Sequence, residues 1–284
     1  MLNNNVERKR IEGVNIIRSR ARGDVFLVEP ILTQLGQKYR VNLTTHYPNI
    51  FSAKDAFTVN RKGEYDITIN LDNVYERHPK QHVLISYINE VKKWIDVDID
   101  FRAPSIQFLD HEKQLISNLR KEPFVIINID PKNEYQNTRR VFGLNIHEMA
   151  NEIKKKHDLN VIECGLYNTY GLPKVTVQNE REVMMLIAAS SFFIGLDSFF
   201  LHIAGALKKK GVGFFGSVNP KFRLFDDAQI AIFQNKCEYQ HCYHNGYHYG
   251  DKKCELNLDI PKCAIHNTND VMDKINQMLS KLPH

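Results

Sequence analysis

Short apolar runs and amphipathic stretches alternate along most of the chain, as strands and helices do in layered α/β proteins. In the first half, the predicted strands cover residues 14–17, 41–45, 65–71 and 105–109. The predicted helices cover residues 25–35 and 82–94. This alternation is typical of parallel sheets, because consecutive parallel strands need a crossover connection, which is usually a helix.

The same alternation begins again after a polar, charged stretch from Asp110 to Glu122. Strands are predicted at 124–129, 160–164, 192–195 and 212–215, and helices at 146–156, 180–189 and 201–207, with a final amphipathic helix capped by Thr268. The predicted fold class is therefore α/β, with two domains, residues 1–118 and 119–284, facing a cleft. Open parallel sheets commonly bind ligands at the carboxyl ends of their strands, which favours the cleft as the ligand site.

The composition is that of an ordinary globular protein, with 43% hydrophobic and 25% charged residues. The net charge is +5, but the basic residues are scattered, and the lysine triplets at 154–156 and 208–210 end predicted helices. No apolar run is long enough to predict a membrane span, and the polar N-terminus lacks the apolar core of a signal peptide. We therefore expect a cytoplasmic protein, whose cysteines are metal ligands or buried thiols more often than disulfides.

The strongest chemical motif runs from Gly195 to Leu207, where a predicted strand leads into a helix. Asp197 and Ser198 stand at the start of that helix, where free N–H groups and the helix dipole favour a phosphate. The alternative is an ordinary capped helix with an apolar face. A second loop, residues 214–220 (FFGSVNP), follows the next strand and is expected at the same edge of the sheet.

These two motifs, D-S-x-x-x-H-x-A-x-A-L and F-G-x-x-x-P, resemble the C-terminal domain of glycosyltransferase family 9, the ADP-heptose:lipopolysaccharide heptosyltransferases. In the first half, RSRARGDV at 18–25 with Pro30 resembles the opening loop of that family, and YDITINL at 65–71 resembles one of its strands, with Asn70 where Asp is usual. The resemblance extends from about residue 14 to residue 280. It implies a GT-B architecture, two Rossmann-like domains, and inverting transfer of a sugar, with heptose from ADP-heptose favoured, to a glycan or protein hydroxyl.

The resemblance also implies site residues. Asp24 matches the loop carboxylate and is the predicted general base, with a helix cap as the alternative. Arg140 stands where the family has a lysine, so it is predicted to bind the leaving diphosphate, with Arg139 or an ordinary surface arginine as alternatives. Further donor-binding residues are expected in the loops and at the helix start: Ser19, Asp197, Ser198, Phe199, His202 and Gly216.

Two of these positions carry a further expectation. His202 either orients the phosphate loop or packs inside its helix. Phe199 and Phe200 stand where the family has a small residue, so a nucleotide sugar is a firmer expectation than heptose itself.

Four cysteines lie close together in the C-terminal part: Cys237, Cys242, Cys254 and Cys263. Their spacing, with histidines between them, predicts a tetrahedral site for structural Zn or Fe, with unbridged thiols as the alternative. A similar segment occurs in many family 9 proteins, and in the autotransporter protein heptosyltransferases it holds iron. Because four protein ligands leave no open coordination position, no catalytic metal is expected. Cys164, on a predicted strand, is expected to be a core thiol.

The expected partners are a nucleotide-sugar donor, with an ADP-sugar favoured, and a glycan or protein acceptor. A peripheral position at the cytoplasmic face of a membrane stays open, whereas a membrane span and a nucleic-acid partner are not expected. One alternative is a catalytically degenerate module that binds a nucleotide sugar or docks a partner. A nucleic-acid-binding metalloprotein is a third possibility, which the scattered charge opposes.

Overall fold

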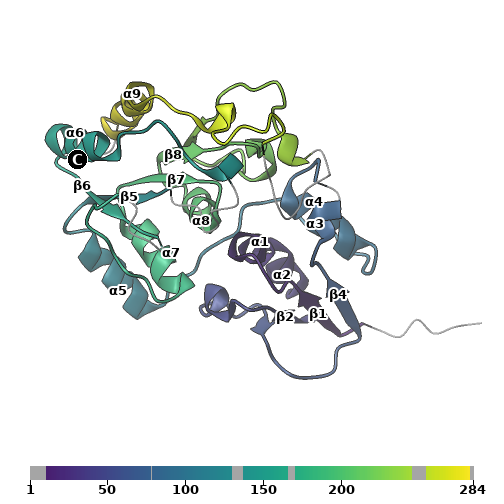
Figure 1. The fold of residues 1–284 in the computed structure, drawn as a ribbon. Helices are drawn as coiled ribbons and strands as arrows, with labels where there is room; N and C mark the ends of the chain where they lie inside the picture. The colour runs from purple at the N-terminus through teal and green to yellow at the C-terminus, as the bar shows by residue number, and fades with distance from the viewer. Residues whose placement is uncertain (1–10, 78, 130–136, 166–169, 245–253, 282–284) are drawn as a thin grey trace, which may run out of the picture.

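The computed structural model describes residues 11–77, 79–129, 137–165, 170–244 and 254–281. Two parallel sheets with helices around them form the fold (Figure 1), with strand orders β3-β2-β1-β4 and β6-β5-β7-β8-β9. This arrangement confirms the predicted α/β class.

The first sheet belongs to the N-terminal half, and all its described pairings are parallel. Its strands are β1 (Gly13–Ile17), β2 (Arg40–Thr44), β3 (Thr58–Val59) and β4 (Ile67–Asn70). The helices of this half are α1 (Arg22–Leu27), α2 (Glu29–Leu35), α3 (Val74–Arg77) and α4 (Val83–Lys92). The single helix predicted at 25–35 is divided at Val28, because Pro30 has no N–H to donate back to the preceding turn.

The second sheet is also parallel, with β7 paired to both β5 and β8. Its strands are β5 (Phe124–Asn128), β6 (Asn160–Glu163), β7 (Phe192–Leu196), β8 (Gly211–Phe214) and β9 (Ile230–Phe233). The helices are α5 (Asp110–Leu119), α6 (Ile146–His157), α7 (Glu180–Ala189), α8 (Phe199–Ala206) and α9 (Thr268–Leu279). Helices α7 and α8 lie on the side of this sheet that faces the N-terminal half (Figure 1).

The segment between the two sheets differs from its prediction. Residues 105–109 belong to no strand, because side chains rather than a neighbouring strand bind their backbone groups. Glu29 Oε2 accepts from the N–H of Ser105 at 2.9 Å, and Arg181 Nη2 donates to the carbonyl of Gln107 at 2.8 Å. The polar stretch after it is largely the helix α5, whose start is capped by Glu112.

Two predicted boundaries can be compared with the structure: the start of the final helix and the division between the two domains. The final helix is capped by Asn267, not by Thr268. The division of the chain at 118/119 stays a prediction; it falls within the last turn of α5, which packs against α7 of the second half.

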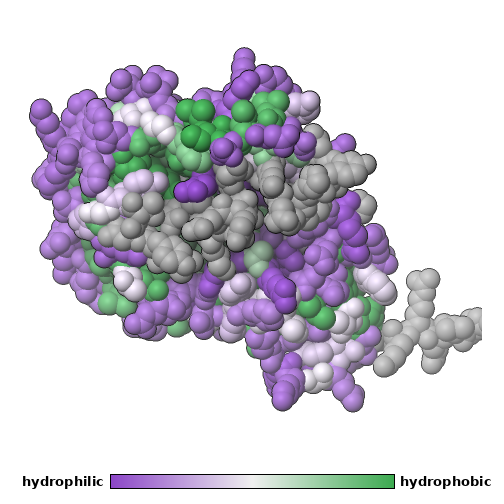
Figure 2. All heavy atoms as spheres, viewed as in Figure 1, coloured by the Kyte–Doolittle hydropathy of each residue, from purple (hydrophilic) through white to green (hydrophobic). Residues whose placement is uncertain are grey.

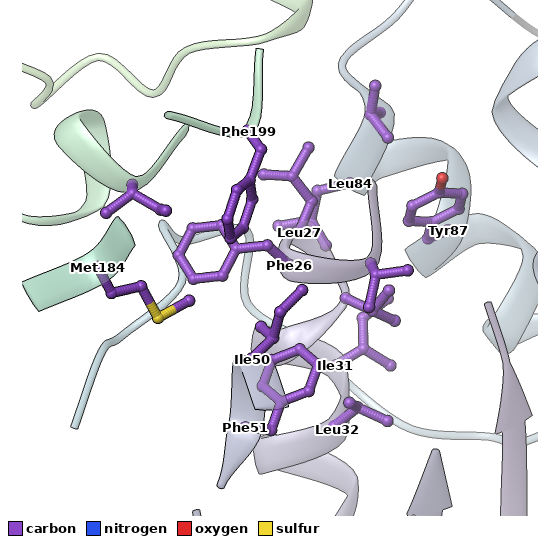
Figure 3. Packing of buried hydrophobic residues seen from close by; sticks show 14 of the residues in the cluster. Phe26, Leu27, Ile31, Leu32, Ile50, Phe51, Leu84, Tyr87, Met184 and Phe199 are labelled. Carbon is purple, nitrogen blue, oxygen red and sulfur yellow. The ribbon is translucent and has the colours of Figure 1, made fainter. Parts of the chain in front are cut away.

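A single buried apolar cluster continues from the first sheet to one face of the second. Phe26 of α1 and Phe199 of α8 point toward each other near Met184 (Figure 3), with ring centroids 6.1 Å apart. The other face of the second sheet is covered by α6 and α9, which form a separate cluster. Cys164 is buried, and burial raises the pKa of its thiol to about 12, so the prediction of a core thiol is confirmed.

The visible surface is mainly hydrophilic, with scattered apolar patches (Figure 2). Among the described residues, no helix combines the length and the apolar character that crossing a bilayer requires.

Candidate active site at the domain interface

Polar side chains gather where the strand order of each sheet changes direction. In the first sheet this point lies between β1 and β4, and Arg18 and Asp72 follow these strands. In the second sheet it lies between β5 and β7, where Ser198 Oγ is 3.4 Å from Oδ1 of Asn128. Ligands of doubly wound sheets bind at such switch points, so both halves present a candidate binding edge.

Asp24 lies in the first turn of α1, and its carboxylate contacts Arg18 rather than the helix backbone. Arg18 Nη2 donates to Asp24 Oδ2 at 2.8 Å, and the Asp24 side chain remains 19% exposed. The N-cap of α1 is Ala21, not Asp24, so the helix-cap alternative for Asp24 is wrong. The partly exposed carboxylate is available to a substrate, as a general base must be.

The start of α1 lies tightly against α8. A Cβ atom added at Gly23 would stand 2.8 Å from Cδ2 of His202, so only glycine fits at the present separation. Ala21 has φ of 60°, an uncommon backbone conformation for a residue with a side chain. Such conformations are often retained at functional sites, where the surrounding structure holds them in place.

Asp197 follows β7 and is buried between two arginines. Its Oδ2 lies 3.3 Å from Arg139 Nη2 and 3.7 Å from Arg223 Nε, and Arg139 also donates to its carbonyl. Burial acts to raise the pKa of the Asp197 carboxyl, but the charges of Arg139 and Arg223 outweigh it and hold this pKa below its usual value. Asp197 is therefore a fixed anion in the site.

His202 is buried on α8, and burial lowers the pKa of its imidazole although Asp197 acts in the opposite direction. The ring is therefore neutral at pH 7. Of the two roles predicted for His202, packing at the contact between α1 and α8 is the one that its surroundings favour.

Arg223 joins the second half to α3. Its Nη2 donates to Tyr75 Oη at 2.6 Å, and Tyr75 Oη donates in turn to Tyr243 Oη at 2.8 Å. The guanidinium also lies over the Tyr75 ring, 4.7 Å from its centroid. Since Arg223 contacts Asp197 as well, one buried cation connects the two halves of the chain.

The two arginines weighed as phosphate ligands have different surroundings. Arg139 is held by Asp197, whereas Arg140 is exposed, with its guanidinium 5.7 Å from the centroid of the Phe142 ring. Gly216 brings its loop against this segment, because a Cβ there would stand 1.8 Å from the carbonyl oxygen of Thr138. The predicted phosphate arginine and the predicted glycine loop are therefore neighbours.

Ser198 is the N-cap of α8, and Phe199 is the first residue of the helix. The Phe199 ring is directed to Phe26 in the interdomain core (Figure 3). The Phe199 side chain therefore packs in the contact between the two halves of the chain. The first N–H groups of α8 have no hydrogen-bond partner within the helix. Ser19 Oγ and its N–H both donate to the Asp72 carboxylate, the backbone bond being 2.9 Å long.

The four cysteines that predict a metal site are all described. Burial and the neighbouring thiols of Cys237, Cys242 and Cys254 raise the pKa of Cys263 to about 12, so the four side chains lie within electrostatic reach of one another. Among the described residues, however, no group of three or more His, Cys, Asp or Glu side chains is arranged to hold a metal ion. The donor chemistry suits Zn or Fe, and the metal stays a prediction.

Several residues of this site were not predicted. Arg18 contacts Asp24 and also pairs with Asp72 and Glu76, and Tyr75 and Arg223 connect the halves. Only Arg18 and Asp72 carried a signal, since Arg18 directly follows β1 and Asp72 comes two residues after β4, at the carboxyl edge of the sheet.

Comparisons with known proteins agree with this arrangement. Residues 143–252 match the model of glycosyltransferase family 9 (heptosyltransferase). The chain is similar in structure to a family 9 glycosyl transferase from Veillonella parvula DSM 2008, with a TM-score of 0.68, 12% identity and coverage of 95% of this chain and 97% of that one. No curated protein sequence matches significantly.

Two structures from E. coli extend the comparison. ADP-heptose lps heptosyltransferase II matches with a TM-score of 0.66 and 15% identity over 95% of this chain and 99% of that one. The iron-containing dodecameric glycosyltransferase TibC, from enterotoxigenic E. coli H10407, gives the same TM-score and identity over 95% of this chain and 77% of TibC. TibC also has a structure in complex with ADP-D-beta-D-heptose.

These likenesses establish the fold, which is the GT-B arrangement of the heptosyltransferases. Together with the family match in the second half, they support glycosyltransferase activity. The matched range ends before Cys254, so the four-cysteine resemblance stays a prediction.

Proposed function

We propose that this protein transfers a sugar from a nucleotide diphosphate to a hydroxyl group with inversion at the anomeric carbon. The observation that supports it best is the position of Asp24 opposite the start of α8. Asp24 is the residue after Gly23, which lies against His202 of α8. The negative charge of Asp24 acts on both His202 and Arg223. A base on one half therefore faces a phosphate-compatible helix start on the other.

The reaction follows from these positions. The acceptor hydroxyl oxygen forms a bond to the anomeric carbon while its proton passes to Asp24. The bond from that carbon to the β-phosphate oxygen breaks, and the nucleoside diphosphate leaves with the electron pair. A single displacement of this kind inverts the configuration, because attack and departure occur on opposite faces.

The charges of the cleft suit such a reaction. The N-terminal side carries three carboxylates, Asp24, Asp72 and Glu76, around one arginine. The C-terminal side carries Arg139 and Arg223, which share the carboxylate of Asp197, and the exposed Arg140. Positive charge that develops at the anomeric carbon is stabilised by the first set, and negative charge on the diphosphate by the second.

The donor is proposed to be an ADP-sugar, with heptose favoured, and the acceptor a glycan or a protein hydroxyl. The donor part rests on the family 9 match and on the ADP-heptose complex of TibC. The expected cytoplasmic location would give access to such a donor. The test is transfer itself: purified protein is incubated with ADP-, UDP-, GDP- and CDP-sugars, and release of the nucleoside diphosphate is measured. Binding of every donor without any release would favour the degenerate binding module.

We expect the true donor to raise the melting temperature of the protein. At 100 times its dissociation constant, a ligand that binds only the folded state adds about 2.7 kcal/mol to the free energy of unfolding. A thermal-shift series over the four classes of nucleotide sugar measures this, with the free sugars as controls. Equal shifts from all four classes would contradict selection of an ADP donor.

Replacing Arg140 by alanine is expected to weaken binding of the nucleoside diphosphate by roughly 10–100-fold, because one charged hydrogen-bond donor to phosphate is lost. Calorimetric titration with ADP measures the change. Arg139→Ala is the comparison: it removes the partner of buried Asp197, so its main expected effect is a lower melting temperature. The reverse order of effects on ADP affinity would move the phosphate role to Arg139.

The four cysteines are proposed to hold one structural Zn or Fe. Support comes from the mutual influence of their thiols and from the iron content of TibC, which has the same fold. Cys237, Cys242, Cys254 and Cys263 would supply four thiolates, and the ion would fix the segment that leads to Tyr243 and the cleft.

A further inference from the structure

We propose that Arg18 is a positioning residue that fixes Asp24 for its reaction with the acceptor hydroxyl. This inference rests on the proposed function, since it concerns the base of the same reaction. It adds to the site a residue that touches neither the sugar nor the phosphate.

Arg18 is buried, and its guanidinium binds three carboxylates at once. Nη1 lies 2.9 Å from Asp72 Oδ1, while Nη2 lies 2.8 Å from Asp24 Oδ2 and 3.3 Å from Glu76 Oε1. The ring of Tyr87 lies beneath, with its centroid 5.6 Å from the guanidinium carbon. A planar cation held on several sides has little freedom to rotate, and it therefore fixes the carboxylate it binds.

The anchoring of Arg18 is itself fixed by the sheet. Asp72 lies just beyond β4, and its carboxylate also accepts from the N–H and the hydroxyl of Ser19, two residues after the end of β1. The Arg18–Asp72 pair thus ties together the two strands at the switch point. Asp24 is in this way connected to the sheet rather than only to the short helix α1.

The contact with Arg18 gives the two carboxylate oxygens of Asp24 different roles. Oδ2 is occupied by Arg18, so the other oxygen is the one presented to an acceptor. A lysine at position 18 would keep the charge but could not form the fork that holds Asp24 and Asp72 together. The effect of the positive charge at position 18 can therefore be measured separately from the effect of the hydrogen bonds that orient Asp24.

Several other ionisable groups act on this site and would contribute to any pH dependence. They are Asp72 after β4, Tyr75 and Glu76 on α3, Tyr87 on α4, His202 on α8 and Arg223 from the second half. Asp24 is surrounded mainly by acids on its own side, and Arg18 is the cation in direct contact with it.

The experiment compares Arg18→Gln, Arg18→Lys and the matched control Arg20→Gln in the whole chain described here, with kcat and KM measured for sugar transfer. Arg20 is exposed in the same loop and has no part in the network. For Arg18→Gln we expect kcat to fall roughly 10–100-fold with KM for the donor little changed, because the charged hydrogen bond that holds Asp24 Oδ2 is lost. For Arg18→Lys we expect a fall of at least about tenfold in kcat, again with KM for the donor little changed, because one ammonium group cannot fork onto both Asp24 and Asp72. Arg20→Gln is expected to behave as the wild type.

Each outcome decides the question. If both Arg18 variants keep the wild-type kcat, the inference is wrong while the proposed function stands. If Arg18→Gln does not fold, as judged by circular dichroism, Arg18→Lys decides through kcat against KM at an unchanged melting temperature. If the wild-type protein transfers no sugar from any donor, the proposed function fails and the inference falls with it.

Discussion

Asp24→Asn is expected to lower the rate of sugar transfer by roughly 10²–10⁴-fold, the usual contribution of a positioned general base. Asparagine is nearly the same size as aspartate, and its amide oxygen can still accept from Arg18 Nη2. It cannot take a proton from the acceptor hydroxyl. The fold and the affinity for the donor should therefore persist while turnover is lost.

Single-turnover measurements of transfer, with calorimetric binding of ADP on the same preparations, test this expectation. Asp98→Asn is a suitable control, because Asp98 is exposed and contacts only Lys92 among the interactions described for it. Full activity in Asp24→Asn would remove this residue from the mechanism. Loss of both ADP binding and turnover would instead indicate that Asp24 maintains the shape of the cleft.

Cys263→Ser is expected to reduce the metal content from about one Zn or Fe per chain to near zero, if the four thiols form one site. A structural ion bound by four thiolates stabilises its segment strongly, with apparent binding free energies of about 10–16 kcal/mol in zinc-finger peptides at neutral pH. Cys263 is buried close to where α9 begins, and α9 packs through Val271 and Ile275. Loss of the ion should thus loosen the chain beyond about residue 236.

Elemental analysis of protein purified without chelator gives the metal content, and limited proteolysis gives the order of the C-terminal segment. Cys164→Ser is the matched control, because Cys164 is buried in the core directly after β6 in the chain and does not belong to the four-cysteine segment. Wild-type protein that contains no metal yet resists protease over this segment would show that the four cysteines are ordinary thiols.

The predictions for Asp24 and Cys263 concern two parts of the structure that are joined by hydrogen bonds and ion pairs. Cys242 precedes Tyr243, whose hydroxyl accepts from Tyr75 on α3, next to Glu76 of the Arg18 network. A displacement of the cysteine segment would therefore be transmitted to α3 and the Arg18 network through the hydrogen bond between Tyr243 and Tyr75. We accordingly expect Cys263→Ser to affect KM for the donor more than Asp98→Asn does.

The sequence by itself determined the class of fold, and it predicted the sheet edges at which a ligand is expected. Apolar runs of strand length alternate with helical periodicity, and this pattern depends only on which face each element buries. Asp197 and Ser198 could be proposed from the sequence because they follow a strand and begin a helix, and Asp24 because its loop resembles that of family 9. Residues 105–109 were assigned wrongly because the groups that bind their backbone, Glu29 and Arg181, are distant in the sequence.

Only the tertiary structure decided which side chains share one charge environment. Arg18 lies 54 positions from Asp72 and 58 from Glu76, and Tyr75 lies 148 from Arg223. Their meeting depends on the pairing of β1 with β4 and on the contact of α1 with α8. Local periodicity carries no information about such pairings, because the free energy that fixes them comes from burying the faces of separate elements against one another.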